Sequence, residues 1–198
     1  MSRHSHIIVA VLFTLLLGAC MSSPANPNPR ANVEPKLASV DLPRYMGRWY
    51  IIANIPYFAE DNFVGSYAQW KLRDDGKIDD SYYAHKGSFD APLKHYQFTD
   101  SIVPRTNNAE WSVRIFWPIY ASQQTRYVDP DYQYTILGYP GKKLDWIFSC
   151  SPTISDEKYH ELLSRLDEMG YDISRFRRVS QTPEQIGKLG FHSPGDKD

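Results

Sequence analysis

Apolar and polar residues alternate along most of the chain with the two-residue period of β-strands. In the segment 110–117, for example, Trp111, Val113 and Ile115 fall on one face, and polar residues fall on the other. The pattern predicts a first strand that starts near Trp49 and seven further strands. These are expected at 66–73, 78–85, 93–102, 110–117, 122–128, 132–139 and 144–150.

Short turns join most of these segments. The run Asp74-Asp75-Gly76-Lys77 predicts a tight hairpin. The connection 54–63 is longer and contains Pro56, which is typical of a lid over one end of a barrel. Eight antiparallel strands joined in this way predict an all-β fold, an up-and-down barrel. A barrel of that size can enclose one small ligand.

The period then changes to that of a helix between residues 155 and 169. Ser155 is placed to cap its start and Gly170 to end it. The apolar residues form one stripe, so we expect this C-terminal α-helix to pack against the outside of the barrel. A short ninth strand is predicted within 175–181, and residues 182–198 are expected to form a flexible tail.

The N-terminus has the pattern of a secretory signal. An apolar run at 7–17 is too short to span a bilayer of roughly 30 Å as a helix. Leu17-Gly18-Ala19-Cys20 resembles a bacterial lipobox, which predicts a signal peptide at 1–19 and a lipid-modified Cys20. Acyl chains such as palmitate on Cys20 would hold the protein on a membrane. Residues 20–38 are rich in Pro, Asn and Ser and predict a flexible tether before the barrel domain at 39–181.

Composition agrees with this picture. Aromatic residues make up 14% of the 198 residues, which favours a β-rich protein with a large apolar interior. The formal net charge is −1, so no basic field indicates a nucleic-acid partner. The two cysteines are Cys20 and Cys150. If Cys20 is acylated, no disulfide can form within the chain.

Three blocks in order resemble the lipocalin family. They are the segment 44–50, which contains Gly47-Arg48-Trp49, then the segment 129–132, and then the segment 146–149 with the 151–157 run that follows it. The resemblance covers residues 42–181 and is closest to the bacterial lipocalins, which are outer-membrane lipoproteins. It implies a lipid-anchored protein that faces the periplasm of a Gram-negative bacterium. Its barrel would bind a fatty acid or a lysophospholipid, for lipid storage, transport or envelope maintenance.

The resemblance has one departure. The family usually places an arginine at the end of the eighth strand, packed across the tryptophan of the first block. Here Cys150 stands at that position. Gly47 and Trp49 are expected to form the structural floor of the barrel. Arg177 or Arg178 from the last strand could replace the missing arginine.

The predicted ligand contacts follow the inward-facing positions of the strands, and Tyr120 is added from its place in the family pattern. They are Ala68, Trp70, Tyr82, Trp111, Val113, Ile115, Tyr120, Tyr134, Trp146 and Phe148. Each of these residues can also be read as ordinary barrel core.

Other chemistry has weaker support. His85 and His95 lie on adjacent predicted strands, but no carboxylate or cysteine beside them completes a metal or haem site, so we expect neither metal nor cofactor. No nucleophile–base motif is evident. A lipocalin-fold enzyme of the isomerase type, acting on a hydrophobic substrate through Cys150 or through a histidine or tyrosine of the cavity, is the alternative. A dimeric scaffold with a filled barrel is a third reading, and a homodimer is one option for the carrier too.

Overall fold

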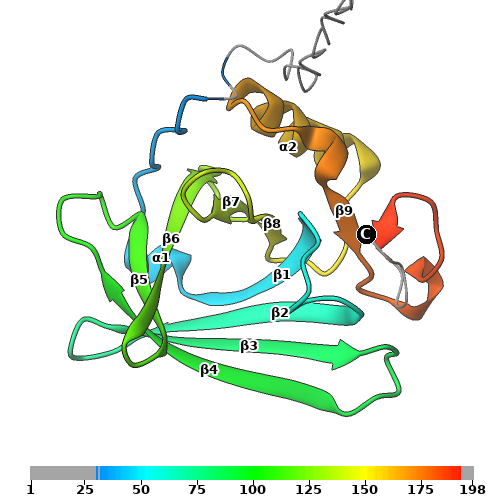
Figure 1. The fold of residues 1–198 in the computed structure, drawn as a ribbon, viewed down its shortest axis with the longest axis horizontal. Coiled ribbons are helices and arrows are strands. Elements are labelled where there is room, and N and C mark those ends of the chain that lie inside the picture. Colours follow the sequence, from blue (N-terminus) through cyan, green and yellow to red (C-terminus); the bar gives the residue numbers. More distant parts are fainter. Residues whose placement is uncertain (1–29, 31, 193–198) are drawn as a thin grey trace, which may run out of the picture.

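The computed structural model describes residue 30 and residues 32–192 and shows a closed antiparallel barrel (Figure 1). Its strands are β1 (Gly47–Asn54), β2 (Phe63–Leu72), β3 (Ile78–Lys86), β4 (Leu93–Ile102), β5 (Glu110–Phe116), β6 (Ile119–Val128), β7 (Tyr134–Gly138) and β8 (Asp145–Ser149). Each strand pairs with the next, and β8 pairs again with β1, which closes the ring. The predicted up-and-down barrel is confirmed.

The strand boundaries differ from the prediction by up to three residues, because β2 and β6 start at Phe63 and Ile119 and not at the predicted residues 66 and 122, and β7 also differs. The Asp129 carboxylate accepts hydrogen bonds from the backbone N–H groups of Gln133 and Tyr134, both at 2.6 Å. Tyr132 has a positive φ of 57° in this turn. The turn therefore extends to residue 133, and β7 starts two residues later than the predicted segment 132–139.

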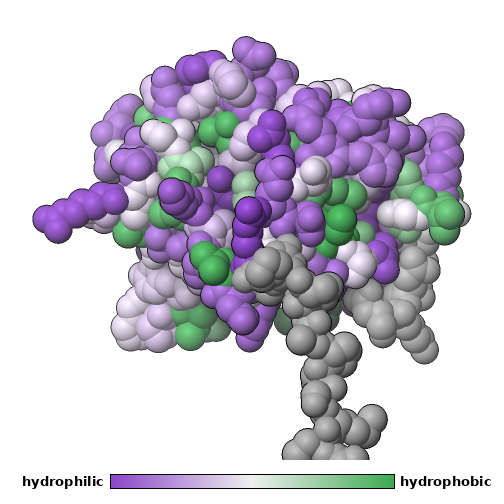
Figure 2. All heavy atoms as spheres, turned by 90° about the horizontal axis from the view of Figure 1, so that it is seen from above, coloured by the Kyte–Doolittle hydropathy of each residue, from purple (hydrophilic) through white to green (hydrophobic). Residues whose placement is uncertain are grey.

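The helix α2 (Asp156–Glu168) packs on the outside of the barrel, as predicted (Figure 1). The Ser155 side chain accepts a hydrogen bond from the backbone N–H of Lys158 and caps the helix. Tyr159, Leu162 and Leu166 are buried in a cluster with residues of β1, β7 and β8. Seen from the side that carries α2, the surface is mainly hydrophilic with separate hydrophobic groups (Figure 2).

The chain after α2 is more ordered than the sequence indicated. It forms η1 (Ile173–Arg175), β9 (Arg177–Val179), η2 (Pro183–Gln185) and β10 (Phe191–His192). The β9 strand pairs antiparallel with β1, and β10 pairs parallel with β9. The Gln181 side chain donates hydrogen bonds to the backbone carbonyls of Ile51 and Ser66. The flexible tail predicted from Thr182 is therefore wrong for residues 182–192, because these contacts fix the segment.

The segment before β1 also packs on the barrel. The backbone N–H of Ala38 donates to the carbonyl of Thr125 at 3.0 Å, and the buried Arg126 forms an ion pair with Glu34 at 3.2 Å. Part of the segment 20–38, predicted as a tether, thus contacts the barrel. The predicted signal peptide and Cys20 lie outside the described residues. Within the described residues, none of the helices has the length and hydropathy needed to cross a membrane.

One end of the barrel is closed by α1 (Leu42–Tyr45) and aromatic side chains. Tyr45 is fully buried, and its ring centroid lies 5.3 Å from that of Trp49 and 5.1 Å from that of Trp70. The Tyr45 hydroxyl bonds to the Thr135 hydroxyl at 2.8 Å, and the Trp49 indole N–H donates to the Tyr45 carbonyl. Gly47 enters β1 with a φ of +122°, which suits glycine.

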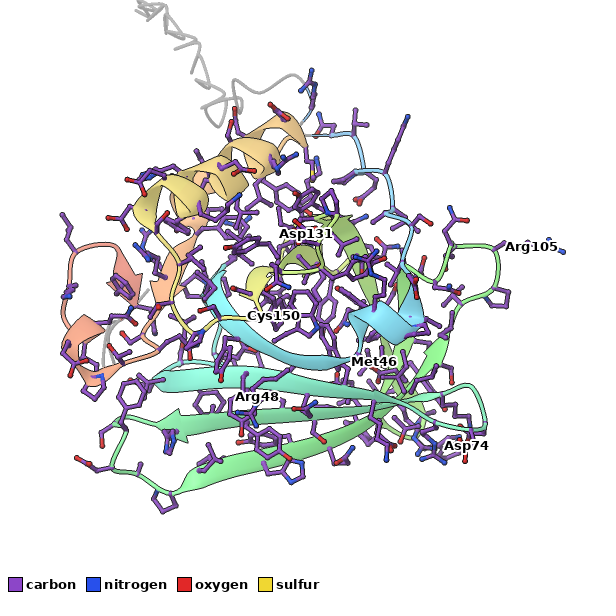
Figure 3. All side chains as sticks on the ribbon, turned by 180° about the vertical axis from the view of Figure 1, so that it is seen from behind. Met46, Arg48, Asp74, Arg105, Asp131 and Cys150 are labelled. Carbon is purple, nitrogen blue, oxygen red and sulfur yellow. The ribbon has the colours of Figure 1, made fainter. Side chains whose placement is uncertain are left out.

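The floor is therefore closed by Tyr45 and not by an arginine from the last strand. Arg178 lies over the rings of Tyr159 and Phe191, and Arg177 donates to backbone carbonyls nearby, so the predicted replacement is wrong. Cys150 follows β8, and its thiol donates to the Tyr132 carbonyl at 3.3 Å. Figure 3 shows Met46 beside α1 and, at the same end of the barrel, Asp74 and Arg105 in the neighbouring connections.

Candidate functional site

The barrel encloses a cavity of about 310 Å³ above the aromatic floor. Its wall is mainly aromatic and aliphatic, with few polar groups. The lining residues are Ile51, Tyr57, Ala59, Glu60, Phe63, Ala68, Trp70, Asp80, Tyr82, Tyr96, Phe98, Val113, Ile115, Gln123, Leu137, Tyr139, Trp146 and Phe148. A concave apolar site with a small number of polar groups is typical of binding sites for small molecules.

The structure brings most of the predicted contact residues together around this cavity. Those that line it are Ala68, Trp70, Tyr82, Val113, Ile115, Trp146 and Phe148. They come from β2, β3, β5 and β8, and in each strand they occupy the inward-facing positions. That these residues contact a ligand stays a prediction.

Three predicted contacts lie elsewhere. Trp111 points inward, but it packs edge-on against Tyr45 and Trp70 in the floor. Tyr134 faces outward and joins the cluster under α2, with Lys158 over its ring. Tyr120 is 53% exposed near the tip of the β5–β6 hairpin. We therefore remove these three residues from the candidate site.

The cavity opens between the β1–β2 connection and strands β4 and β5. Ala59, Tyr96 and Ile115 belong to the lining and are also exposed to solvent. The pairing of β4 with β5 runs over Asp100, Ser101 and Ile102, at the floor end of both strands. Toward the other end the two strands separate, which leaves room for a ligand to enter.

The predicted lid contributes residues that sequence reasoning did not identify individually. Glu60, in the β1–β2 connection, lies in the cavity wall, and its Oε2 accepts hydrogen bonds from Asn54 Nδ2 at 2.6 Å and Trp146 Nε1 at 2.9 Å. Burial raises the pKa of Glu60 to about 7, although these donors oppose the shift. Tyr57 packs edge-on against Trp146 at a centroid distance of 6.0 Å. The lid is thus tied to β8 through Trp146.

A second polar group lies deeper in the barrel. Asp80 is in the wall, and its Oδ1 accepts a hydrogen bond from Trp70 Nε1 at 3.0 Å. Asp100 is fully buried on the adjacent strand β4. Burial raises the pKa of both carboxyl groups, and the charge of Asp80 raises that of Asp100 further. The alternating pattern indicated inward positions here but not this pair of acids.

The free energy of unfolding is expected to decrease as pH rises from about 4 to about 7. Burial raises the pKa of Glu60 and of Asp145 to about 7, so both stay protonated in the folded protein where the unfolded chain has lost these protons. The stabilisation is complete below the unfolded pKa, about 4, and is lost as pH passes through about 7.

Urea unfolding across this range measures how steeply the free energy of unfolding falls with pH. Glu60→Gln is expected to make this fall less steep, whereas Glu168→Gln, at an exposed position on α2, serves as the matched control. A stability that rises over the same interval would contradict the assignment.

The other candidate groups lie outside the cavity wall. His95 stacks on Tyr83 with centroids 4.4 Å apart, and His85 bonds to the Ala91 carbonyl, so the two histidines do not face each other. Burial raises the pKa of the half-buried Cys150 thiol, which disfavours the nucleophilic thiolate. In the described part of the chain, no three His, Cys, Asp or Glu side chains are grouped to hold a metal.

Comparison with known families identifies the barrel. Residues 40–181 match the family described as a lipocalin-like domain. The chain belongs to the lipocalin family. The match confirms the resemblance inferred from the three sequence blocks, and it covers the closed barrel, α2 and β9.

Among curated proteins, this lipocalin is 30% identical to the outer membrane lipoprotein Blc of Escherichia coli K12 over 178 residues. The alignment covers 88% of this chain and 96% of that protein. It is also 29% identical to temperature-induced lipocalin-1 of Arabidopsis thaliana, over 79% of this chain and 88% of the plant protein. Bacterial lipoproteins and a plant lipocalin are thus both relatives, and neither name refers to an enzymatic reaction.

Solved structures give the same fold. The cockroach allergen Per a 4 superposes with a TM-score of 0.59 at 19% identity, covering 76% of this chain and 94% of that one. Insecticyanin from the tobacco hornworm Manduca sexta gives a TM-score of 0.58 at 18% identity, covering 76% and 86%. At such identities the likeness establishes the lipocalin fold and nothing about the ligand.

Proposed function

We propose that this lipocalin binds one hydrophobic molecule inside its barrel and serves as a carrier or store for fatty acids or lysophospholipids. The observation that carries the proposal is the apolar cavity of about 310 Å³ with an opening between the lid and strands β4 and β5. A filled barrel, the scaffold reading, would lack this space. Its similarity to the Blc lipoproteins supports a lipid ligand.

The size of the cavity limits what it can enclose. A cavity of roughly 150 Å³ takes one benzene ring, so twice that volume takes on the order of a dozen carbon atoms. At about 0.8 kcal/mol per methylene, a twelve-carbon chain gains roughly 10 kcal/mol of gross burial, which is opposed by association costs of about 4–15 kcal/mol. Longer chains would extend through the opening, with their head group outside.

We further propose that Cys20 carries the acyl chains that hold the protein on the outer membrane. The path of the chain between Cys20 and the barrel supports an orientation in which the open end faces the bilayer. Connections in an up-and-down barrel alternate between its two ends, so the β7–β8 connection lies at the same end as the lid. Lys142 of this connection donates to the carbonyl of Arg30, ten residues after Cys20. The anchor would thus leave the domain at its open end.

Exposed apolar side chains occur at this same end. They are Phe58 in the lid, Leu93 at the start of β4, and Phe116, Trp117, Ile119 and Tyr120 around the β5–β6 hairpin. Trp117 is 81% exposed and Phe58 is 88% exposed. Aromatic side chains of this kind favour the interface between water and lipid. They support transfer of a lipid between the bilayer and the cavity.

The proposal predicts that protein purified without added lipid carries lipid that mass spectrometry detects after solvent extraction. Added dodecanoate or lysophospholipid should quench tryptophan fluorescence saturably, because Trp70 and Trp146 line the cavity. The experiment uses the Cys20→Ser variant, so that lipid attached covalently at Cys20 is not counted as ligand. Failure of every fatty acid and lysophospholipid to bind saturably would exclude the carrier function.

An enzymatic role finds no comparable support. Neither Cys150 nor His85 lines the cavity, and burial raises the pKa of the lining Tyr82, which disfavours an ionised phenolate. Cys150 lies at the floor end, where its thiol bonds to the Tyr132 carbonyl. We therefore propose ligand binding as the function of the site.

A further inference from the structure

The acidic side chains in the cavity wall have no basic side chain beside them. Glu60 and Asp80 are carboxyl groups, and the lining residues of the described chain include no lysine, arginine or histidine. A buried polar group needs a partner, and a buried charge needs a counter-charge. The wall therefore offers acceptors to a ligand but no cation that could neutralise an anionic one.

The two carboxyl groups mark opposite ends of the cavity. Glu60 belongs to the lid, where Trp146 and Asn54 hold its Oε2. Asp80 lies next to the floor, since its partner Trp70 pairs with Gly47, the first residue of β1. An enclosed ligand would have an acidic group near it whichever end its polar group occupied.

The buried carboxyl group of Asp100, beside Asp80, adds to the acidic character of this end of the cavity. Asp100 is fully buried, and its carboxyl group interacts with that of Asp80. The hydroxyl of Tyr82, on the cavity wall, is shielded from solvent and interacts with Glu60. The neighbouring carboxyl groups of Asp80 and Asp100 disfavour any further negative charge at this end of the cavity. The wall thus carries carboxyl groups and no cationic side chain to balance them.

We propose that the cavity selects ligands whose enclosed polar group is a hydrogen-bond donor, an alcohol or a protonated amine, and rejects an ionised carboxylate. This inference rests on the proposed function, because it specifies the ligand class of the same cavity. An alcohol donates to Glu60 or Asp80 and brings no further negative charge into the cavity. A protonated amine supplies the missing counter-charge.

The selection applies to groups that are enclosed. A fatty acid with a long chain can leave its carboxylate outside the opening and avoid Glu60 and Asp80. A chain of about twelve carbons fits inside, so its head group has to approach one of the two acids. Discrimination is therefore largest for short ligands and decreases as the chain grows.

The test compares dodecanol, dodecylamine and dodecanoate below their aggregation concentrations at pH 8, with tryptophan fluorescence as the readout. Dodecanol and dodecylamine are expected to bind about tenfold or more tightly than dodecanoate, the effect of one pKa unit of charge repulsion. Hexadecanol and hexadecanoate are expected to differ less. Equal binding of dodecanol and dodecanoate would overturn the selection and leave the carrier function standing.

Variants identify the groups responsible. The double variant Glu60→Gln, Asp80→Asn removes both charges and keeps oxygen acceptors for Trp146 and Trp70. It is expected to bind dodecanoate about tenfold more tightly than the wild type does and to lose the preference for the amine. Asp79→Asn is the matched control, because Asp79 is the neighbouring residue on β3 and pairs with Arg73 on the outer face.

Each remaining result is decisive. An unchanged preference in the double variant, with circular dichroism showing a folded barrel, would refute the role of these two acids. A change of the same size in Asp79→Asn would also refute it, since general charge would then explain the effect. If none of the ligands binds to the wild type, the proposed function itself fails.

Discussion

Replacing Ala68 with tryptophan is expected to weaken binding of a hydrophobic ligand about a hundredfold while the barrel stays folded. Ala68 lies on β2, is 4% exposed and lines the cavity. The small side chain of Ala68 leaves space in the cavity, whereas the side chain of Trp70, two residues further along the same face, fills it. An indole at position 68 would extend into the cavity and occupy volume that the ligand needs.

The expected loss follows from the volume that is removed. An indole that displaces four methylene groups of a bound chain removes about 3 kcal/mol of burial, or roughly a hundredfold in affinity. Added bulk in a packed interior costs about 1–3 kcal/mol of stability. The cavity absorbs part of this bulk, so the fold should tolerate the change. Titration with dodecanol and thermal unfolding together measure both effects.

Lys71→Trp provides the control for this prediction. Lys71 lies on the same strand, is exposed and points to the outer face, so the same side chain there should leave affinity unchanged. Binding by Ala68→Trp at the wild-type affinity would place the ligand outside the cavity. The exposed apolar side chains at the open end would then be the next candidates.

The alternation of residues predicted much of the cavity because inward and outward positions differ in polarity along β2 and along most of β5. It failed at β7, where both faces are apolar. Tyr134 and Ile136 face α2, and Leu137 lines the cavity. A strand covered on both sides carries no polar face, so the pattern cannot show which way its side chains point. Tyr134 was assigned to the wrong face for this reason.

The floor and the lid depend on contacts between residues that are far apart in the sequence. Tyr45 closes the floor through its hydroxyl contact with Thr135, and Glu60 joins the wall through Trp146, 86 residues away. Neither contact produces a periodic pattern in the sequence. Residues 182–192 also depend on a contact of this kind, because the guanidinium group of Arg178, on β9, lies over the ring of Phe191. Sequence patterns indicated where the strands and α2 form, and these distant contacts determine how the barrel is closed.

The largest loss of stability is expected for Trp49→Ala. Trp49 is 1% exposed and packs against Tyr45 and Trp70, with centroid distances of 5.3 Å and 6.0 Å. Its indole N–H donates to the Tyr45 carbonyl at 2.9 Å, which links β1 to α1. Truncation leaves a void in the floor and an unpaired carbonyl. Together they are expected to lower the free energy of unfolding by about 3–5 kcal/mol.

Urea unfolding measures this difference, and Trp117→Ala supplies the comparison. The Trp117 side chain is 81% exposed, so its loss should change the free energy of unfolding by less than about 0.5 kcal/mol. Both variants remove a tryptophan side chain, so a difference between them reports the effect of its position in the fold. Equal effects in the two variants would mean that Tyr45, Trp70 and Trp111 close the floor without Trp49. A large effect confined to Trp49→Ala would instead locate the stabilising contacts at the junction of α1 and β1, where Gly47 directs the chain into the barrel.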